Sequence, residues 1–187
     1  TTQETRREFI KWKAWIADTT PVPTPQTPEY AGVVGLFEGA RFQVSGWYRP
    51  KQNCKMRTLF NPFCEVCREA LVKAIYRRVD PIEFFPPETV GILVNLAQSV
   101  VLTISPMKPA GHNLKIQWFI NRIPVAGANS VLFQQSGQML GVGIHTISVE
   151  VVDTTPMVRN DPERLLAESK SWTVTVTAAP VRSRRRP

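Results

Sequence analysis

The second half of the chain alternates apolar and polar positions in the way that is typical of β-strands. The clearest segments are "SVVLTIS" (99–105), "LKIQWFI" (114–120), "HTISVEVV" (145–152) and "SWTVTVT" (171–177), with weaker ones around 90–97 and 130–134. They are rich in β-branched residues, and turn signals such as Asn121-Arg122 separate them. The pattern predicts a small antiparallel β-sandwich with Trp118 in its core.

The first half begins with a different pattern. Over residues 1–17, Phe9, Trp12 and Ile16 recur at helical spacing. Thr1 with Glu4 has the form of a capping box. These features predict a helix over residues 1–17.

A proline-rich stretch, "DTTPVPTPQTPEYAG" (18–32), follows. Each proline lacks a backbone N–H and fixes φ, so we expect an extended, helix-free loop. Two interpretations stay open, a linker or a loop that wraps a domain surface. Short apolar runs with glycine turns over 33–48 predict short strands.

The strongest helix signal lies in "NPFCEVCREALVKAIYRR" (61–78). Asn61 is a good cap, Pro62 suits a first turn, and two arginines favour the C-terminal end. The predicted buried stripe consists of Phe63, Cys67, Ala70, Leu71, Ala74 and Ile75. The pattern changes near residues 80–88, so we expect two modules, the first mixed and the second all-β.

The net charge of the 187 residues is +8. Half of this excess lies in the last seven residues, "VRSRRRP". A basic run without interleaved aromatic residues predicts only salt-sensitive, non-specific attraction to nucleic acid, so we expect no specific nucleic-acid partner. No run of about 18 apolar residues predicts a membrane span, so we expect no membrane partner. The chain has no leader pattern and does not begin with Met, which suggests a processed or excised product.

All three cysteines lie within residues 54–67. Cys64-x-x-Cys67 has zinc-knuckle spacing with Cys54 as a third ligand, but a structural zinc site needs four ligands, and the two histidines, His112 and His145, lie in the β module. No βαβ pattern supports a redox motif. If the protein is exported, a disulfide from Cys54 to either Cys64 or Cys67 would leave one free thiol. Helical geometry disfavours a bond between Cys64 and Cys67 themselves.

Residues 35–71 resemble a known family. The segment contains Phe37-Glu38-Gly39, Gly46-Trp47-Tyr48-Arg49-Pro50, Cys54-Lys55-Met56-Arg57 and Phe63-Cys64-Glu65-Val66-Cys67. In this order the motifs resemble the segment after the zinc motif of the IgA-peptidase-like zinc metallopeptidases. The stretches "IKWKAWI" (10–16) and "VEVVDTTPMVRNDP" (149–162) resemble that family as well.

The resemblance implies an α+β chain. Residues 1–82 would be the rear portion of a zincin-like catalytic domain, 83–178 an immunoglobulin-like sandwich, and 179–187 a disordered basic tail. The whole protein would be a secreted or periplasmic zinc metallopeptidase acting on a protein or peptide substrate. Its His-Glu-x-x-His motif is not in this sequence. We therefore expect zinc in the full-length protein, no metal in this chain, no activity of this chain alone, and an upstream catalytic segment as partner.

The resemblance also implies site roles. Met56 would be the methionine of a Met-turn below the metal, or a core residue that fills a gap. The Tyr48 hydroxyl would donate to the oxyanion, and Arg49 would hold substrate backbone or carboxylate. The alternative for both is a turn packed against Trp47, with Arg49 bonding carbonyls. Glu38 is interpreted as structural.

A different class of function stays open. The β-sandwich would then be a non-catalytic module that binds protein or glycan, and residues 1–80 would be its helical mount. A His-Glu-x-x-His motif in the reading frame upstream of Thr1 favours the enzyme, whereas a start codon there favours the module.

Overall fold

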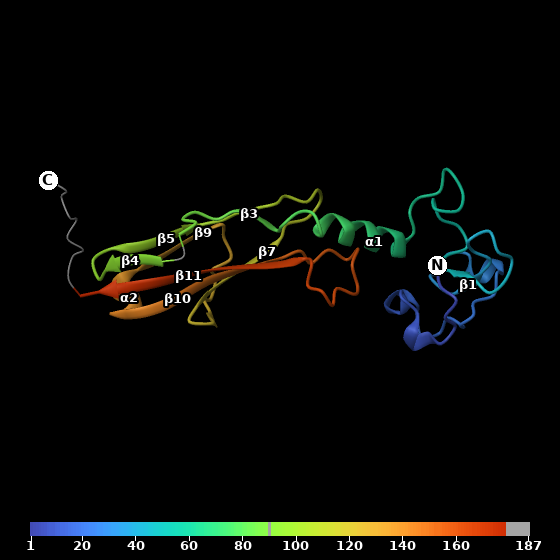
Figure 1. Ribbon diagram of the computed structural model, residues 1–187, viewed down its shortest axis with the longest axis horizontal. Helices are drawn as coiled ribbons and strands as arrows, with labels where there is room; N and C mark the ends of the chain where they lie inside the picture. Colours follow the sequence, from blue (N-terminus) through green and yellow to red (C-terminus); the bar gives the residue numbers. More distant parts are fainter. Residues whose placement is uncertain (90, 179–187) are drawn as a thin grey trace. The chain divides into compact units, whose positions relative to one another are not determined.

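A computed structural model describes residues 1–89 and 91–178 (Figure 1). The predicted basic tail, 179–187, lies outside the described residues. The chain divides into two compact units. Unit 1 comprises Thr1–Ile75 with Pro156–Asp161, and unit 2 comprises Tyr76–Thr155 with the chain from Pro162 onward. The domain limits expected from the sequence stay a prediction.

Within its described residues, unit 2 contains strands at all six segments that the alternating pattern predicts, and three further strands of two or three residues that it does not predict. The strands are β3 (Ile82–Phe84), β4 (Gly91–Asn95), β5 (Ser99–Thr103), β6 (Ser105–Pro106), β7 (Lys115–Ile120), β8 (Ile123–Pro124), β9 (Leu132–Ser136), β10 (Gly143–Val152) and β11 (Ala167–Thr177), with one short helix, α2 (Gly137–Leu140). The larger sheet has the order β4-β11-β10-β7-β8, while β5 pairs with β9 and β3 with β6.

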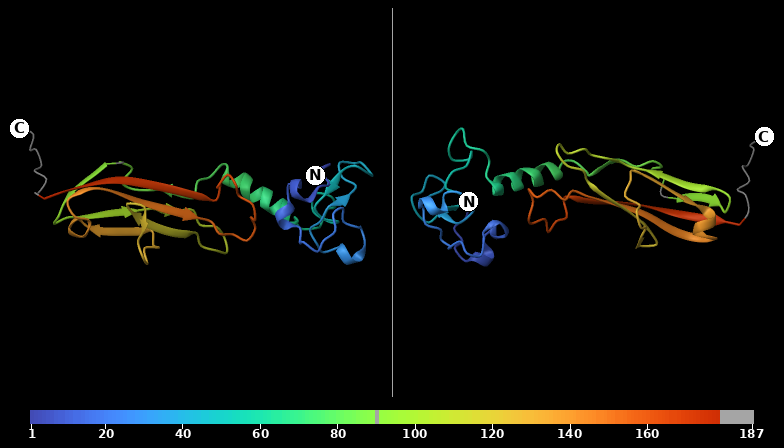
Figure 2. Two further views of the ribbon diagram at one scale, coloured as in Figure 1. Left: turned by 90° about the horizontal axis from the view of Figure 1, so that it is seen from below. Right: turned by 180° about the vertical axis from the view of Figure 1, so that it is seen from behind.

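The larger sheet and the β5–β9 pair enclose one core (Figure 2). Val100, Leu102 and Phe133 enter it from the smaller pair, and Val149 and Trp172 from the larger sheet. The prediction that Trp118 lies in this core is confirmed, since its side chain is fully buried. One part of the prediction is wrong. The sandwich is not wholly antiparallel, because β4 runs parallel to β11. A short hairpin joins only antiparallel strands, but β4 and β11 come from opposite ends of the unit and are joined by a long connection, which permits parallel pairing.

The predicted turn at Asn121-Arg122 is confirmed. Both residues have positive φ, 53° and 69°, as a two-residue type I′ hairpin requires. The Asn121 side-chain oxygen also accepts the backbone N–H of Thr146 at 2.9 Å. The turn therefore joins β7 to β8 and is fixed to β10.

A buried polar cluster lies at the end of β10. The Tyr76 hydroxyl donates to Oδ2 of Asp153. Asp153 Oδ1 accepts the Thr155 N–H at 2.7 Å and lies 2.7 Å from Nε2 of His112. Burial, and then the Asp153 carboxylate, raise the pKa of Tyr76 above its usual value.

Replacing Tyr76 with phenylalanine is expected to lower the free energy of unfolding of unit 2 by about 1.5–3 kcal/mol at pH 7, because a hydrogen bond to a charged group is lost. The raised pKa means that the folded state favours the protonated phenol. The stabilisation of the folded state by this hydrogen bond is therefore complete below the usual tyrosine pKa of about 10 and declines as the pH rises further. Urea unfolding at pH 7 and pH 11 tests this, with Tyr30→Phe as control. A stability difference that stays constant to pH 11 would contradict the assignment.

Unit 1 does not contain the helix expected over residues 1–17. Two 3₁₀ turns, η1 (Arg7–Phe9) and η2 (Lys13–Trp15), stand in its place. The Glu4 carboxylate accepts the N–H groups of Thr5 and Arg6, and these local bonds compete with a capping box and a first helical turn. Trp12 and Ile16 are buried, but Phe9 is exposed.

The proline-rich segment packs onto unit 1, so its interpretation as a free linker is wrong. Thr24 is buried. Its backbone N–H donates to the carbonyl of Leu36, and its hydroxyl oxygen accepts the N–H of Leu36, both at 2.8 Å. The segment contains no α-helix; besides extended residues it has one 3₁₀ turn, η3 (Pro28–Tyr30), and turns near both of its ends. It wraps the surface around the buried Leu36.

The expected short strands are β1 (Phe37–Glu38) and β2 (Tyr48–Arg49), which pair antiparallel. The expected helix is α1 (Glu65–Tyr76). It begins later than predicted because the preceding residues are held elsewhere. The Lys55 N–H donates to the carbonyl of Pro62, and the Cys64 N–H donates to Sγ of Cys54. None of the helices in the described part of the chain is long and apolar enough to span a membrane.

The predicted buried stripe of α1 is wrong for four residues: Ala70, Leu71, Ala74 and Ile75 are exposed. The helix turns its other face inward. Val66 packs against the core of unit 1. The buried Glu69 accepts the indole N–H of Trp15 and pairs with Lys73 at 3.1 Å. This buried polar contact, which apolar periodicity does not reveal, sets the rotation of the helix.

Candidate functional site

Unit 1 contains a cavity of about 750 Å³. Residues after β1, the loop after β2 and the first turns of α1 form its wall. The lining residues that carry charge or sulfur are Arg41, Arg49, Lys51, Cys54, Met56, Arg57, Cys64 and Cys67. The stretch 49–67 therefore supplies most of the charged and sulfur-containing side chains that line the cavity.

Arg49 is the most buried charged residue of this wall, at 8% exposure. Its Nη1 donates to the carbonyls of Glu38 and Gly39, and its Nη2 donates to Oε1 of Gln26 at 2.9 Å. Burial, and then the charge of Arg57, lower the pKa of Arg49. Its buried Nε has no hydrogen-bond partner among the described residues. The geometry favours the interpretation in which Arg49 bonds carbonyls.

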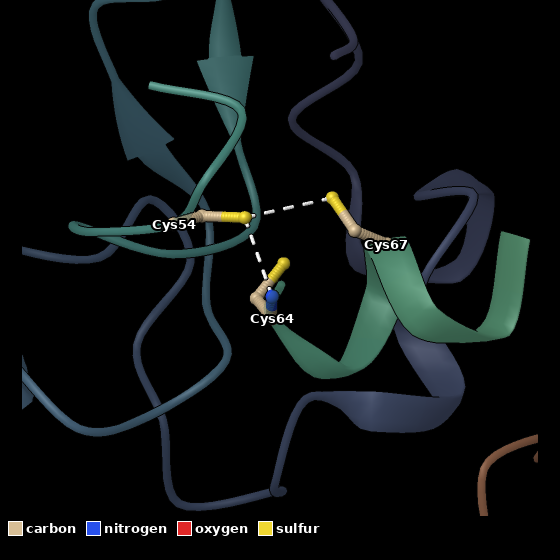
Figure 3. Close-up of side chains that lie close together, drawn as sticks. All are labelled: Cys54, Cys64 and Cys67. Carbon is tan, nitrogen blue, oxygen red and sulfur yellow. Dashed lines mark hydrogen bonds between the residues drawn. The ribbon is translucent and has the colours of Figure 1, made fainter. Parts of the chain in front are cut away.

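The structure brings all three cysteines together (Figure 3). Cys54 comes from the loop after β2, Cys64 immediately precedes α1, and Cys67 lies in its first turn. Their Sγ atoms lie within 4.8 Å of one another, and those of Cys54 and Cys67 are 3.7 Å apart. All three are free thiols. The disulfide from Cys54 expected from the sequence stays a prediction.

The three thiols have different electrostatic environments. Burial opposes ionisation of Cys54, but N–H donors of Cys64 and Met56 outweigh it and lower the pKa of this thiol. Burial raises the pKa of Cys64 and of Cys67, and the neighbouring thiols add to the rise at Cys67. One sulfur of the trio therefore ionises more readily than the other two.

The other predicted site residues occupy different places. Tyr48 is half-buried and packs against the core of unit 1, and the lining of the cavity described above includes Arg49 but not Tyr48. Met56 lines the cavity and is 74% exposed, so its interpretation as a core residue is wrong. The Glu38 carboxylate accepts the Gly46 N–H at 2.9 Å, which is a structural use.

The two histidines lie in unit 2, and each has polar partners there. His112 contacts Asp153, while His145 Nε2 lies 3.0 Å from the carbonyl oxygen of Gly141. His112 lies in a loop and His145 in β10, so both are in the β module as predicted.

Sequence reasoning missed the basic residues of the wall. Lys51 pairs with Glu65 at 2.8 Å and joins the loop after β2 to the start of α1. Arg57 Nη1 donates to the carbonyl of Gln52 at 2.7 Å. The available signal was the density of Lys and Arg around the Cys-x-Met motif.

Comparisons with known proteins give one family match. Residues 26–75 match the family model described as IgA Peptidase M64. No curated protein matches the chain significantly. A solved structure, a quinonprotein alcohol dehydrogenase-like protein from Bacteroides thetaiotaomicron, is 10% identical with a TM-score of 0.38. That match covers 52% of this chain and 20% of the other. The match to the family model relates residues 26–75 to a peptidase family.

Proposed function

We propose that unit 1 is the C-terminal part of the catalytic domain of a secreted or periplasmic zinc metallopeptidase, and that unit 2 is its immunoglobulin-like module. The observation that carries the proposal is that the family match and the cavity wall involve the same part of the chain. The match to the peptidase family covers residues 26–75, and nearly all of the cavity wall comes from the same residues.

The surface of the cavity suits an extended peptide. Phe42 and Met56 are exposed on the lining and offer apolar contacts for side chains. Arg41 and Arg57 lie on the same lining and offer cations for carboxylates. A protein or peptide substrate is therefore the ligand class that we propose.

The residues of this chain do not fit a catalytic zinc site of the His-Glu-x-x-His type. The sequence lacks the motif, and both histidines lie in unit 2 with other partners. We therefore assign this chain no step that passes through a catalytic metal. Its proposed role is to form the substrate-facing wall, while an upstream segment supplies the zinc ligands.

Three residues have proposed roles in this wall or next to it. Arg49 positions the end of β1 through its bonds to Glu38 and Gly39. Met56 stays a candidate for a Met-turn. The Tyr48 hydroxyl stays a candidate oxyanion donor, although its half-buried position on the unit 1 core also suits a packing role.

The isolated chain is expected not to cleave casein, whereas the protein extended by the coding sequence that precedes Thr1 is expected to cleave it. The extended protein should lose cleavage on dialysis against a chelator and regain it with zinc. Peptide release from fluorescent casein is the measurement.

The matched control is the extended protein with the glutamate of its His-Glu-x-x-His replaced by glutamine, which should stay folded and inactive. Cleavage by the isolated chain would overturn the proposal. So would a start codon directly upstream of Thr1 or an extended frame without the motif, and either would favour the binding module.

A further inference from the structure

The three cysteine sulfurs have the spacing of metal ligands. Sγ of Cys54 and Sγ of Cys67 are 3.7 Å apart. Zinc–sulfur bonds of about 2.3 Å at tetrahedral angles place neighbouring sulfur atoms about 3.8 Å apart. A disulfide requires a sulfur–sulfur distance of about 2.05 Å. The observed spacing matches one edge of a zinc-centred tetrahedron.

The third sulfur completes a face of the same tetrahedron. All three Sγ atoms lie within 4.8 Å of one another, so one ion can contact all of them after small side-chain rotations. Two of the cysteines, Cys54 and Cys64, are buried at 7% and 5% exposure. Figure 3 shows the side chains of Cys54 and Cys67 directed toward each other, with Cys64 beside them.

The backbone around the cluster supports bound thiolates. The Cys64 N–H donates to Cys54 Sγ at 3.3 Å. The Cys64 carbonyl accepts the Arg68 N–H at 2.9 Å, so Cys64 occupies the N-cap position of α1. The positive end of the helix dipole therefore lies at the cluster and favours negative charge on sulfur. The ion pair of Lys51 with Glu65 ties the preceding loop to the same helix turn.

The surroundings also define the coordination number. The chain has three cysteines, and both histidines have other partners in unit 2. Cys54, Cys64 and Cys67 all line the cavity. A fourth ligand therefore enters from the cavity, as water or as an exogenous donor, which is the arrangement of zinc sites that keep one position open.

We propose that Cys54, Cys64 and Cys67 bind one zinc ion, with the fourth coordination position open to the cavity of unit 1. Thiolates favour soft metals over calcium or magnesium, and the near-tetrahedral spacing favours zinc. The proposal replaces the expectation of no metal in this chain and of a disulfide with one free thiol. It does not depend on the proposed peptidase, whose catalytic metal would have histidine ligands from another segment.

The metal content of the full 187-residue chain tests the proposal. The chain is produced without a polyhistidine tag in zinc-supplemented medium and dialysed extensively. We expect about one zinc per chain by mass spectrometry. Cys54→Ser and Cys67→Ser should each reduce it at least tenfold, whereas Gln43→Ala, an exposed residue of the same cavity, should leave it unchanged.

A second measurement on the unchanged chain covers the case in which the cysteine variants do not fold. Cobalt added to zinc-free protein should give sulfur-to-cobalt charge-transfer absorption and the visible bands of a tetrahedral ion. Chelation of the zinc should release three reactive thiols per chain. No bound zinc and no charge-transfer absorption would overturn the proposal. A single thiol in the denatured chain would overturn it in favour of the disulfide.

The outcomes also separate this site from the proposed function. Zinc retained by the isolated chain, without casein cleavage by the extended protein, would support the cysteine site and refute the peptidase. The Cys67→Ser substitution can also be made in the extended protein. If that variant loses the cysteine-bound zinc but still cleaves casein, the two proposals are both supported and the two metals are independent. Stoichiometric zinc that survives in all three single cysteine-to-serine variants would refute the cysteine site.

Discussion

Replacing Trp118 with alanine is expected to lower the free energy of unfolding of unit 2 by about 3–5 kcal/mol, because it removes one of the two fully buried tryptophan side chains of the sandwich. The indole ring stacks on Phe133 at 4.9 Å and on Trp172 at 5.8 Å between ring centroids. Its Nε1 donates to the carbonyl of Ser130 at 2.9 Å. Alanine would leave a cavity between the sheets and an unpaired carbonyl.

Urea unfolding followed by near-ultraviolet circular dichroism measures the effect. Trp118→Phe should cost less, since it retains most of the volume and loses only the indole donor. Phe84→Ala is the control, because Phe84 is an aromatic residue of the same unit that is 52% exposed, and its loss should cost under about 1 kcal/mol. Equal losses in Trp118→Ala and Phe84→Ala would show that the two sheets do not share the core assigned to them.

The sequence predicted unit 2 well because its information is local. Alternation of β-branched and polar residues determines which face of each strand is buried, and the Asn121-Arg122 turn fixes one register on its own. The parallel pairing of β4 with β11 was not predictable in this way. It joins strands more than 70 residues apart in the sequence, and alternation does not show which strand becomes the neighbour of which.

The sequence predicted unit 1 less well because polar contacts override its apolar spacing. Phe9, Trp12 and Ile16 are spaced as in a helix, yet the Glu4 carboxylate holds the first N–H groups and the chain forms 3₁₀ turns. In α1, the bond from Trp15 to Glu69 turns a carboxylate inward and leaves Leu71 exposed. Hydrophobic periodicity does not encode such long-range polar bonds.

The candidate site was predictable in its residues but not in its arrangement. The spacing of Cys64 and Cys67 placed both within one helical turn. The return of Cys54 to that turn depends on the backbone bond from Lys55 to Pro62, which no motif reveals. The sequence therefore left a metal and a disulfide as alternatives, and the zinc content and thiol count of the purified chain would distinguish between them.

Replacing Arg49 with methionine is expected to lower the free energy of unfolding of unit 1 by about 3–4 kcal/mol. Methionine keeps much of the apolar stem but removes every donor of the guanidinium. The carbonyls of Glu38 and Gly39 would then lose a buried charged donor, and each unpaired group costs about 1–3 kcal/mol. Arg49→Lys should be intermediate, because a single ammonium cannot reproduce the planar fork that spans both carbonyls and Gln26.

Thermal unfolding of unit 1, followed by the fluorescence of its tryptophans, measures the loss. Arg57→Gln is the matched control, since Arg57 lines the same cavity but is exposed and makes a single carbonyl bond. Its replacement should cost under about 1 kcal/mol. The two interpretations of Arg49 predict opposite results. If Arg49 holds substrate, Arg49→Met keeps its melting temperature while the KM of the extended protein rises. If Arg49 positions β1, stability falls before any substrate is added, and turnover per folded molecule changes little.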